Sequence, residues 1–217
     1  GGREMSATQG TPEWLQERCG FATASRLSDI MAKIKTGEAA SRATYRAELV
    51  AQRLTNTMPE SYTNAAMQHG TEFEPFARAA YEIQRSEIVT EVGFIHHPTI
   101  EWTGASPDGL VGDDGLIEIK CPNTATHIDY LLKGAVPAKY QPQMLWQMAC
   151  TGRKWCDFAS YDPRMPVELQ LFVVRFERDD LRLKEAETEV IAFLGEVEST
   201  VKALERLIAG QRAKVAA

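Results

Sequence analysis

The sequence has no apolar run that approaches the length of a membrane span, no internal repeat and no low-complexity tract. Hydrophobic residues make up 44% and charged residues 25% of the 217 residues, as in ordinary globular proteins. No shift in composition divides the chain into comparable halves. We therefore expect no membrane association and one domain over residues 11–210, between an N-terminal tail of residues 1–10 and a C-terminal tail of residues 211–217.

Closely spaced cysteines are also absent, because Cys19, Cys121, Cys150 and Cys156 form no C-x-x-C pair. A chain of this length needs no disulfides, so we expect reduced and mostly buried thiols. The residues before Met5 lack the basic start and the apolar stretch of a secretion signal, which favours an intracellular location. The four histidines share no metal-ligand spacing and are expected to be structural or on the surface.

A basic excess is absent as well, since 24 Lys and Arg stand against 30 Asp and Glu, a net charge of −6. Proteins that hold nucleic acid by charge alone are usually basic. The acidity is uneven, however: residues 1–60 contain eight basic and seven acidic side chains, whereas residues 177–206 contain five and nine. The C-terminal excess is expected to be one solvated helix face, which leaves the remaining surface free to meet phosphate.

Helical periodicity covers much of the chain. Thr11-Pro12-Glu13 has the N-cap, first-position proline and early acid of a helix start, and Gly20 is the expected stop. Ser41 is the expected cap of a later helix, and Gly70 is expected to interrupt another. The predicted helices cover residues 12–18, 24–33, 41–55, 63–84, 124–133, 139–151 and 179–208.

Alternating patterns predict strands between these helices. Residues 88–108 change to a β period, and residues 155–161 and 168–176 alternate around an Asp-Pro-Arg turn. The turn residues Gly112 to Gly115 predict a hairpin that joins a strand near 108–111 to one at 115–121.

Glu118 and Lys120 carry the first chemical signal. In a strand they share one face, and the segment around them is apolar enough to be buried. A buried acid and lysine are costly unless they are paired or bound to metal, which favours a functional site. A surface Glu-x-Lys on an edge strand is the plainer alternative.

Asp108 can join this pair through the hairpin. A loop of residues 112–114 places Asp108 opposite Glu118, and a loop of 113–115 places it opposite Lys120; a two-residue turn puts it on the wrong face. Two carboxylates on one face are hard oxygen ligands that suit Mg²⁺ or Mn²⁺. A lysine beside such a metal can orient or help deprotonate water for phosphodiester hydrolysis.

These residues resemble a known family. Ser106-Pro107-Asp108-Gly109 and Glu118-Ile119-Lys120-Cys121-Pro122 are similar to the PD-(D/E)xK nuclease motif, in the form found in the phage lambda exonuclease and YqaJ-type viral recombinase family. Further segments resemble that family in the same order: Trp14-Leu15-x-x-Arg18-x-Gly20, Thr23-Ala24-Ser25, Gly70-Thr71-Glu72-Phe73-Glu74, Tyr140-Gln141-Pro142-Gln143 and Tyr161-Asp162-Pro163-Arg164. The resemblance covers residues 12–176.

The resemblance implies an α/β (α+β) fold with a restriction-endonuclease-like core, a central mixed β-sheet flanked by helices. It implies Asp108, Glu118 and the backbone carbonyl of Ile119 as metal ligands, and Lys120 as the group that acts on the nucleophilic water. Some related nucleases carry a cysteine-ligated iron–sulfur cluster, and the lack of a close cysteine pair counts against one here.

Further catalytic residues follow from the same resemblance. Glu74 matches the helix glutamate near the metals, with Glu72 as its rival because helix phase is uncertain from sequence. Gln143 matches the glutamine near the nucleophile, with Gln141 as its rival, because the segment before it is a few residues shorter than in the lambda protein.

Three residues are implied as ligands of a 5′-phosphate. Arg18 and Ser25 match the residues that hold this group in the family, and Ser106 is a third candidate. A planar guanidinium with hydroxyls is a sound phosphate receptor. A solvated arginine at a helix end is the plainer reading of Arg18.

The resemblance implies a Mg²⁺-dependent 5′-to-3′ exonuclease, with Mn²⁺ able to substitute, that acts on double-stranded DNA ends and leaves 3′ overhangs for phage-type recombination. It also implies a homotrimeric ring, a single-strand annealing protein as partner, and a phage or prophage protein in the cytoplasm of a bacterial host. The alternatives are a non-catalytic DNA-end binding or adaptor module, and a site-specific endonuclease of the same fold.

Overall fold

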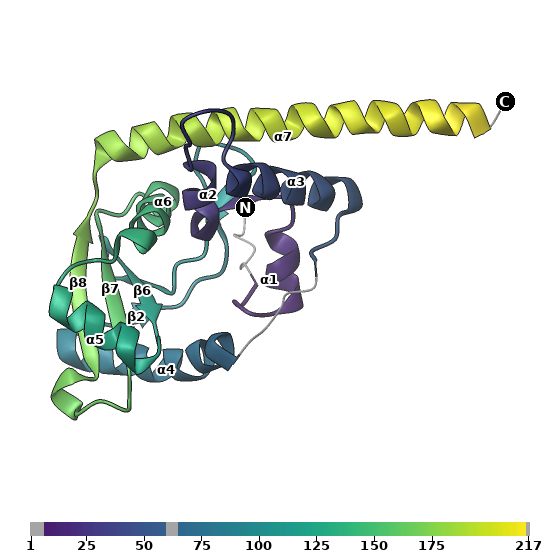
Figure 1. Cartoon of the computed structure of the whole chain (residues 1–217). Helices are drawn as coiled ribbons and strands as arrows, with labels where there is room; N and C mark the ends of the chain where they lie inside the picture. The colour runs from purple at the N-terminus through teal and green to yellow at the C-terminus, as the bar shows by residue number, and fades with distance from the viewer. Residues whose placement is uncertain (1–6, 60–64, 216–217) are drawn as a thin grey trace.

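The computed structural model describes residues 7–59 and 65–215, which form a mixed α/β structure (Figure 1). Its α-helices are α1 (Pro12–Glu17), α2 (Leu27–Ile30), α3 (Ala40–Thr55), α4 (Ala65–Arg85), α5 (Thr124–Lys133), α6 (Gln141–Thr151) and α7 (Asp180–Val215), with 3-10 helices η1 (Ala24–Arg26), η2 (Ala138–Tyr140) and η3 (Val167–Leu169). Its strands are β1 (Ala22–Thr23), β2 (Val89–Thr90), β3 (Ile95–His96), β4 (Thr103–Ala105), β5 (Gly109–Val111), β6 (Gly115–Lys120), β7 (Trp155–Tyr161) and β8 (Leu171–Glu177).

The strands form two sheets. The larger has the order β2-β5-β6-β7-β8, in which β6 and β7 are parallel and the other neighbours are antiparallel. The smaller has the order β1-β4-β3, with β1 parallel and β3 antiparallel to β4. The predicted central mixed sheet is therefore confirmed, and β6 lies in its middle.

The two faces of β6 pack into two different cores. Leu116 belongs to the core that includes α6 and α7, whereas Ile117 and Ile119 pack with Ala77 and Tyr81 of α4. The alternation expected of a strand is thus present, and each face is covered by helices. Because Glu118 follows the parity of Leu116, its side chain is directed towards α6 rather than α4.

Most predicted elements are confirmed, with corrections at their ends. Thr11 caps α1 by accepting a hydrogen bond from the Trp14 backbone nitrogen. Ser41 is not the cap of α3, because the helix starts at Ala40 after Ala39, which makes no side-chain cap. The helix expected over residues 24–33 ends at Ile30, and the start of the strand expected at 168–176 is a 3-10 helix.

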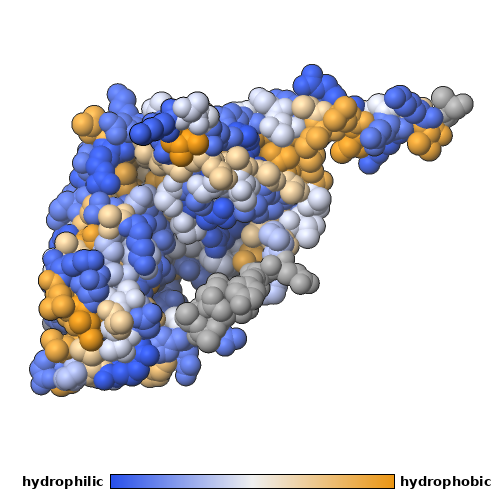
Figure 2. Space-filling model, viewed as in Figure 1, coloured by the Kyte–Doolittle hydropathy of each residue, from blue (hydrophilic) through white to orange (hydrophobic). Residues whose placement is uncertain are grey.

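The final helix α7 is longer than the predicted residues 179–208, since it continues to Val215 (Figure 1). Its apolar stripe is buried from Val190 to Val201, but Leu207 and Ile208 are exposed on the end that extends past the rest of the molecule (Figure 2). Periodicity does not show where the surface that buries the stripe ends. No helix in the described part of the chain is long and apolar enough to cross a membrane.

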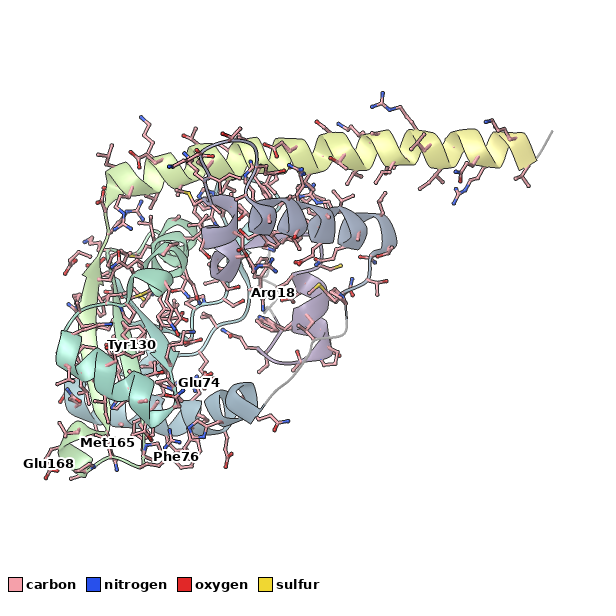
Figure 3. All side chains as sticks on the ribbon, viewed as in Figure 1. Arg18, Glu74, Phe76, Tyr130, Met165 and Glu168 are labelled. Carbon is pink, nitrogen blue, oxygen red and sulfur yellow. The ribbon has the colours of Figure 1, made fainter. Side chains whose placement is uncertain are left out.

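Helix α4 buries only part of its apolar surface. Ala77 and Tyr81 are fully buried, whereas Phe76 is exposed and lies on the outer side of the helix (Figure 3). The helix also passes through Gly70 and contains Pro75, so Gly70 does not interrupt it. The first two residues of the predicted range, 63–64, lie outside the described residues.

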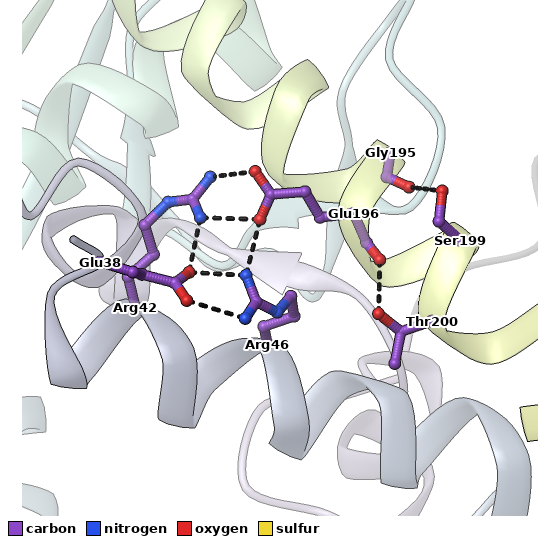
Figure 4. Close-up of polar contacts among 7 residues, drawn as sticks. All are labelled: Glu38, Arg42, Arg46, Gly195, Glu196, Ser199 and Thr200. Carbon is purple, nitrogen blue, oxygen red and sulfur yellow. Dashed lines mark hydrogen bonds and ion pairs between the residues drawn. The ribbon is translucent and has the colours of Figure 1, made fainter. Parts of the chain in front are cut away.

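Helix α7 is fastened to α3 by a network of charges (Figure 4). Arg42 donates to both carboxylate oxygens of Glu196 at 2.7 and 2.8 Å and to Glu38 at 2.7 Å, and Arg46 contacts the same two acids. These hydrogen bonds, foremost those from Arg42, lower the pKa of both glutamates from the usual 4.5. The four side chains are partly exposed, so salt will screen the network.

We expect stability to fall on acidification through this network. A carboxyl whose folded pKa is lowered stabilises the fold above its unfolded pKa of 4.5 and loses that contribution as pH falls below it. Glu196→Gln should lower the urea midpoint at pH 7 and flatten its decline below pH 4.5. Glu185→Gln, at an exposed position on the same helix, is the control and should follow the wild type.

Candidate active site

Glu118 is the centre of a polar cluster inside the protein. Its side chain has no exposed surface. Its Oε1 atom accepts a hydrogen bond from Gln143 Nε2 at 2.7 Å and lies 2.5 Å from Lys120 Nζ, and its Oε2 accepts from Gln147 Nε2 at 2.6 Å. A buried carboxylate requires such partners, because desolvation without them is costly.

Asp108 joins the cluster by the hairpin register. Gly109 pairs with Ile117 and Val111 with Gly115, which leaves a loop of residues 112–114 and places Asp108 opposite Glu118. One of the two registers that bring Asp108 to the correct face is therefore confirmed. Asp108 Oδ2 also accepts a hydrogen bond from the Ile119 backbone nitrogen at 2.6 Å.

The electrostatics of the cluster are those of crowded acids. Burial, followed by repulsion from Glu118, raises the pKa of Asp108 well above its usual value. Burial alone would lower the pKa of Lys120, but the charges of Glu118 and Asp108 raise it further than burial lowers it. Lys120 therefore remains an ammonium beside two acids that repel each other.

Glu74 approaches the cluster from α4. Burial raises its pKa, Lys120 lowers it, and the charges of Glu118 and Asp108 interact with it. The Glu74 carboxylate is already engaged, because its Oε1 atom accepts a hydrogen bond from Arg78 Nη2 at 2.7 Å. Glu72 is exposed, so the structure places Glu74 rather than its rival beside the acids.

The glutamine register is also decided by contacts. Gln143 reaches Glu118, whereas the Gln141 amide donates to the Val136 carbonyl at 3.2 Å. Sequence reasoning missed Gln147, which is fully buried and holds the other oxygen of Glu118. Its signal was the spacing of four residues from Gln143, which puts both amides on one face of α6.

Arg18 lies at the end of α1, across the centre of the molecule from Glu74 (Figure 3), and the surface is hollowed in this region (Figure 2). Its guanidinium is 4.1 Å from the centre of the Trp14 ring, and Trp14 Nε1 donates to Ser106 Oγ at 3.0 Å. Arg18 is thus connected to the segment that carries Asp108. Its Nε is buried without a hydrogen-bond partner among the described residues.

Ser25 makes no hydrogen bond with Arg18 or Ser106 among the described residues. It is exposed, and its hydroxyl is 3.3 Å from Thr23 Oγ1. The Thr23 backbone nitrogen donates to the Tyr45 hydroxyl. Burial lowers the pKa of Arg18.

No cysteine or histidine in the described part of the chain makes a hydrogen bond to Asp108, Glu118 or Lys120, although Cys156 Sγ donates to Gln147 Oε1 at 3.8 Å. All four cysteines are free and buried, as predicted. His127 is buried and forms a hydrogen bond with the Ser160 hydroxyl. His97 stacks on Trp146, a buried core residue. Within residues 7–59 and 65–215 no three His, Cys, Asp or Glu side chains form a group able to hold a metal by themselves.

Comparisons with known proteins agree with this geometry. The family model described as the YqaJ-like viral recombinase domain matches residues 13–154. The chain belongs to this family. The crystal structure of an alkaline exonuclease, LHK-Exo from Laribacter hongkongensis, is similar at 57% identity and a TM-score of 0.87, over 93% of this chain and 100% of that one.

Two further structures extend the comparison. LHK-Exo in complex with dAMP matches with the same identity, coverage and TM-score. A phage-related exonuclease from Haemophilus somnus 129PT matches at 16% identity, with a TM-score of 0.70, over 85% of this chain and 96% of that one, and supports the fold alone. No curated protein sequence matched. The predicted restriction-endonuclease-like fold and the predicted class of enzyme, a deoxyribonuclease, are confirmed.

The residues of this YqaJ-family chain fit a hard divalent cation. Two carboxylates, Asp108 and Glu118, face each other in a desolvated site, and burial and mutual repulsion raise the pKa of Asp108. A cation between them would relieve that repulsion, and oxygen donors favour Mg²⁺ or Mn²⁺. Because Asp108 and Glu118 alone supply too few oxygen ligands for such a cation, backbone carbonyl oxygen and water must complete the coordination.

We expect Gln147 to matter for this site as much as the acids it positions. Gln147→Ala leaves the buried Oε2 of Glu118 without a donor, and losing an outer partner of a metal ligand typically costs about 10- to 100-fold in metal affinity or activity. The measurement is the Mg²⁺ concentration that gives half-maximal cleavage. Gln141→Ala is the matched control and should stay near wild type; equal behaviour of the two variants would contradict this role.

Proposed function

We propose that this YqaJ-family enzyme is a Mg²⁺-dependent exonuclease that degrades one strand of duplex DNA from its 5′ end and leaves a 3′ overhang. The single observation that carries the proposal is the desolvated cluster of Asp108, Glu118 and Lys120, held by two glutamine amides. Folding does not explain this cluster, because two buried acids that face each other do not stabilise a sheet. Ionisable groups kept together at such a cost are typical of a catalytic site.

Asp108, Glu118 and the Ile119 carbonyl would hold the cation. A bound Mg²⁺ polarises the scissile phosphate and lowers the pKa of water, and Mn²⁺ can do the same. The residues then have separate tasks. Gln143 and Gln147 fix the Glu118 carboxylate from both oxygens, so that it does not rotate when substrate binds.

Lys120 supplies the positive charge closest to the acids. Its raised pKa keeps the proton on Nζ in the absence of substrate. From this position the ammonium orients the attacking water and offsets negative charge that develops on the phosphate oxygens. Glu74, on α4, would accept a hydrogen bond from the same water after its carboxylate separates from Arg78.

The direction of digestion is proposed to come from Arg18. Its Nε has no partner in the described part of the chain, and burial lowers its pKa, as expected of a cation awaiting an anion. Trp14 links it to Ser106, two residues before Asp108, so a terminal phosphate on Arg18, Ser106 and Ser25 would lie near the metal site. The relative LHK-Exo binds dAMP, a mononucleotide.

The assembly and partners remain part of the proposal. The resemblance to the lambda exonuclease family implies a homotrimeric ring, and a ring would keep a chain with a net charge of −6 on DNA by topology rather than by charge. A single-strand annealing protein that receives the 3′ overhang is the proposed partner. The proposed setting is the cytoplasm of a bacterial cell that carries the phage or prophage.

The decisive experiment uses linear duplex DNA labelled at either end, with Mg²⁺ or with EDTA. We expect Mg²⁺-dependent release of mononucleotides from the 5′ end. A mobility shift without cleavage would indicate a DNA-end binding module, and internal cuts at a fixed sequence would indicate an endonuclease.

Asp108→Ala and Lys120→Ala should each lower the rate by well over tenfold, because each removes a charge that acts on the reacting phosphate. Loss of one such contact costs at least ~1.4 kcal/mol of transition-state stabilisation. The thermal unfolding temperature of Asp108→Ala should not fall, because this change removes one of two acids that repel each other. Lys120→Ala should lower it, because the buried Glu118 loses its cationic partner. Retention of more than about a tenth of the wild-type rate would count against the site.

Arg18→Ala should act selectively on 5′-phosphorylated ends. The wild type should prefer a 5′-phosphate over a 5′-hydroxyl, and the variant should compress that ratio, because the lost contact exists only with the phosphate present. Lys33→Gln, an exposed cation paired with Glu189, is the control and should keep the ratio. Equal slowing of both substrates by Arg18→Ala would remove the physical basis of the proposed polarity.

A further inference from the structure

A recess of about 440 Å³ opens beside the candidate active site, between α5 and η2. Its polar lining comes from Thr126, Asp129, Tyr130, Lys133 and Lys139, and the remainder is small and apolar. Neither the metal cluster nor the Arg18 group includes any of these residues. The recess therefore has no role in the function proposed above.

The Tyr130 hydroxyl is the first indication of a ligand. Tyr130 is 4% exposed, and its buried hydroxyl makes no well-aligned hydrogen bond among the described residues, although the Lys139 ammonium and the Tyr140 hydroxyl lie near it (Figure 3 shows the side chain on α5). Burying a hydroxyl without a partner costs free energy, so such groups usually await water or a ligand. Because Tyr130 lines the recess, a ligand oxygen placed there can satisfy it.

Lys139 is the second indication. Its Nζ lies 4.7 Å from the Tyr140 ring centre and 5.9 Å from the Tyr130 ring centre, and no carboxylate in the described part of the chain pairs with it. Lys133 differs, because Asp129 holds its Nζ at 2.7 Å. The recess thus contains one ammonium that is neutralised by an acid and one that is not.

Tyr140 connects the recess to the catalytic lysine. Its ring is stacked on Phe158, and Lys120 Nζ lies 5.1 Å from the ring centre. Because Lys139 Nζ is 4.7 Å from the same centre, the two ammonium groups are at most about 10 Å apart. Phosphates of one B-DNA strand follow each other at ~3.4 Å along the axis, so about three nucleotides span the distance from Lys120 to Lys139.

We propose that this recess is a subsite for one backbone phosphate of the DNA strand that is being cut. Lys139 supplies the charge, the hydroxyls of Tyr130 and Thr126 supply hydrogen bonds, and the apolar lining from Val136 and Pro137 meets the adjoining deoxyribose. Lys133 contributes less, since Asp129 offsets it. The inference rests on the proposed function, because it assumes that DNA is the substrate.

The test places one neutral methylphosphonate at successive positions along the cut strand and measures the single-turnover rate. Neutralising the phosphate that occupies the recess should slow the wild type at least about tenfold, the loss expected for a charge-assisted hydrogen bond. Lys139→Gln should slow the all-phosphate duplex by a similar factor and should lose sensitivity at that position alone. Tyr130→Phe should show a smaller loss of sensitivity at the same position.

Two controls separate this subsite from general charge and from folding. Lys154→Gln removes an exposed lysine that is paired with Asp114, and it should keep the wild-type profile. Tyr130→Phe removes a buried hydroxyl that makes no well-aligned hydrogen bond, so its thermal unfolding temperature should not fall. Lys139→Gln should also reduce the slope of log affinity against log salt by about one, measured with Ca²⁺ to prevent cleavage.

Other outcomes overturn the subsite. Identical methylphosphonate profiles for the wild type and Lys139→Gln would do so, as would a profile change equal to that of Lys154→Gln. A Lys139→Gln variant that binds inorganic phosphate or dAMP more weakly, yet keeps the wild-type profile, would assign the recess to a free phosphate compound instead. Failure of the wild type to digest the all-phosphate duplex would instead contradict the proposed function itself.

Discussion

The whole site depends on an ionisable group that has no access to water. Glu118 has a fully buried side chain in the middle of the main sheet, and burying a carboxylate is costly unless each oxygen is satisfied. Lys120, Gln143 and Gln147 supply those partners. The position of α6 over the sheet is therefore part of the chemistry, since both amides come from one face of that helix.

The same constraint explains how the surrounding strands are arranged. Because β6 has β5 on one side and β7 on the other, Glu118 is shielded laterally, and the three-residue hairpin loop returns Asp108 to the position opposite it. A second acid in a shielded place is repelled by the first, which raises the pKa of Asp108. The fold thus brings two carboxyl groups together whose repulsion a divalent cation can offset.

Positive groups are distributed around Asp108 and Glu118 rather than concentrated in one basic surface. Lys120 is inside the cluster, Arg18 rests on Trp14 at one side, and Lys139 shares the Tyr140 ring with Lys120 at another. An aromatic ring contacts each of the three cations and helps to fix its position. Only Lys120 is also paired with a carboxylate. An acidic protein can in this way present a few fixed charges to a phosphate backbone.

The sequence by itself determined the chemistry and most of the elements. The sequence predicted that Glu118 and Lys120 share one face of a strand, because residues two apart in a strand point to the same side. It also predicted Asp108 as the second carboxylate. The cap of α1 and the bounds of α5 followed from local signals of the same kind. Family membership was likewise predicted from an ordered set of short motifs and then confirmed.

Only the tertiary structure decided the features that depend on what lies next to an element. The parity of the hairpin loop selected the partner of Asp108, the docking of α6 brought Gln147 to Glu118, and the phase of α4 chose Glu74 over Glu72. The exposed Phe76 and the long end of α7 show the same limit. Periodicity reports which residues share a face, but burial depends on whether another part of the chain covers that face.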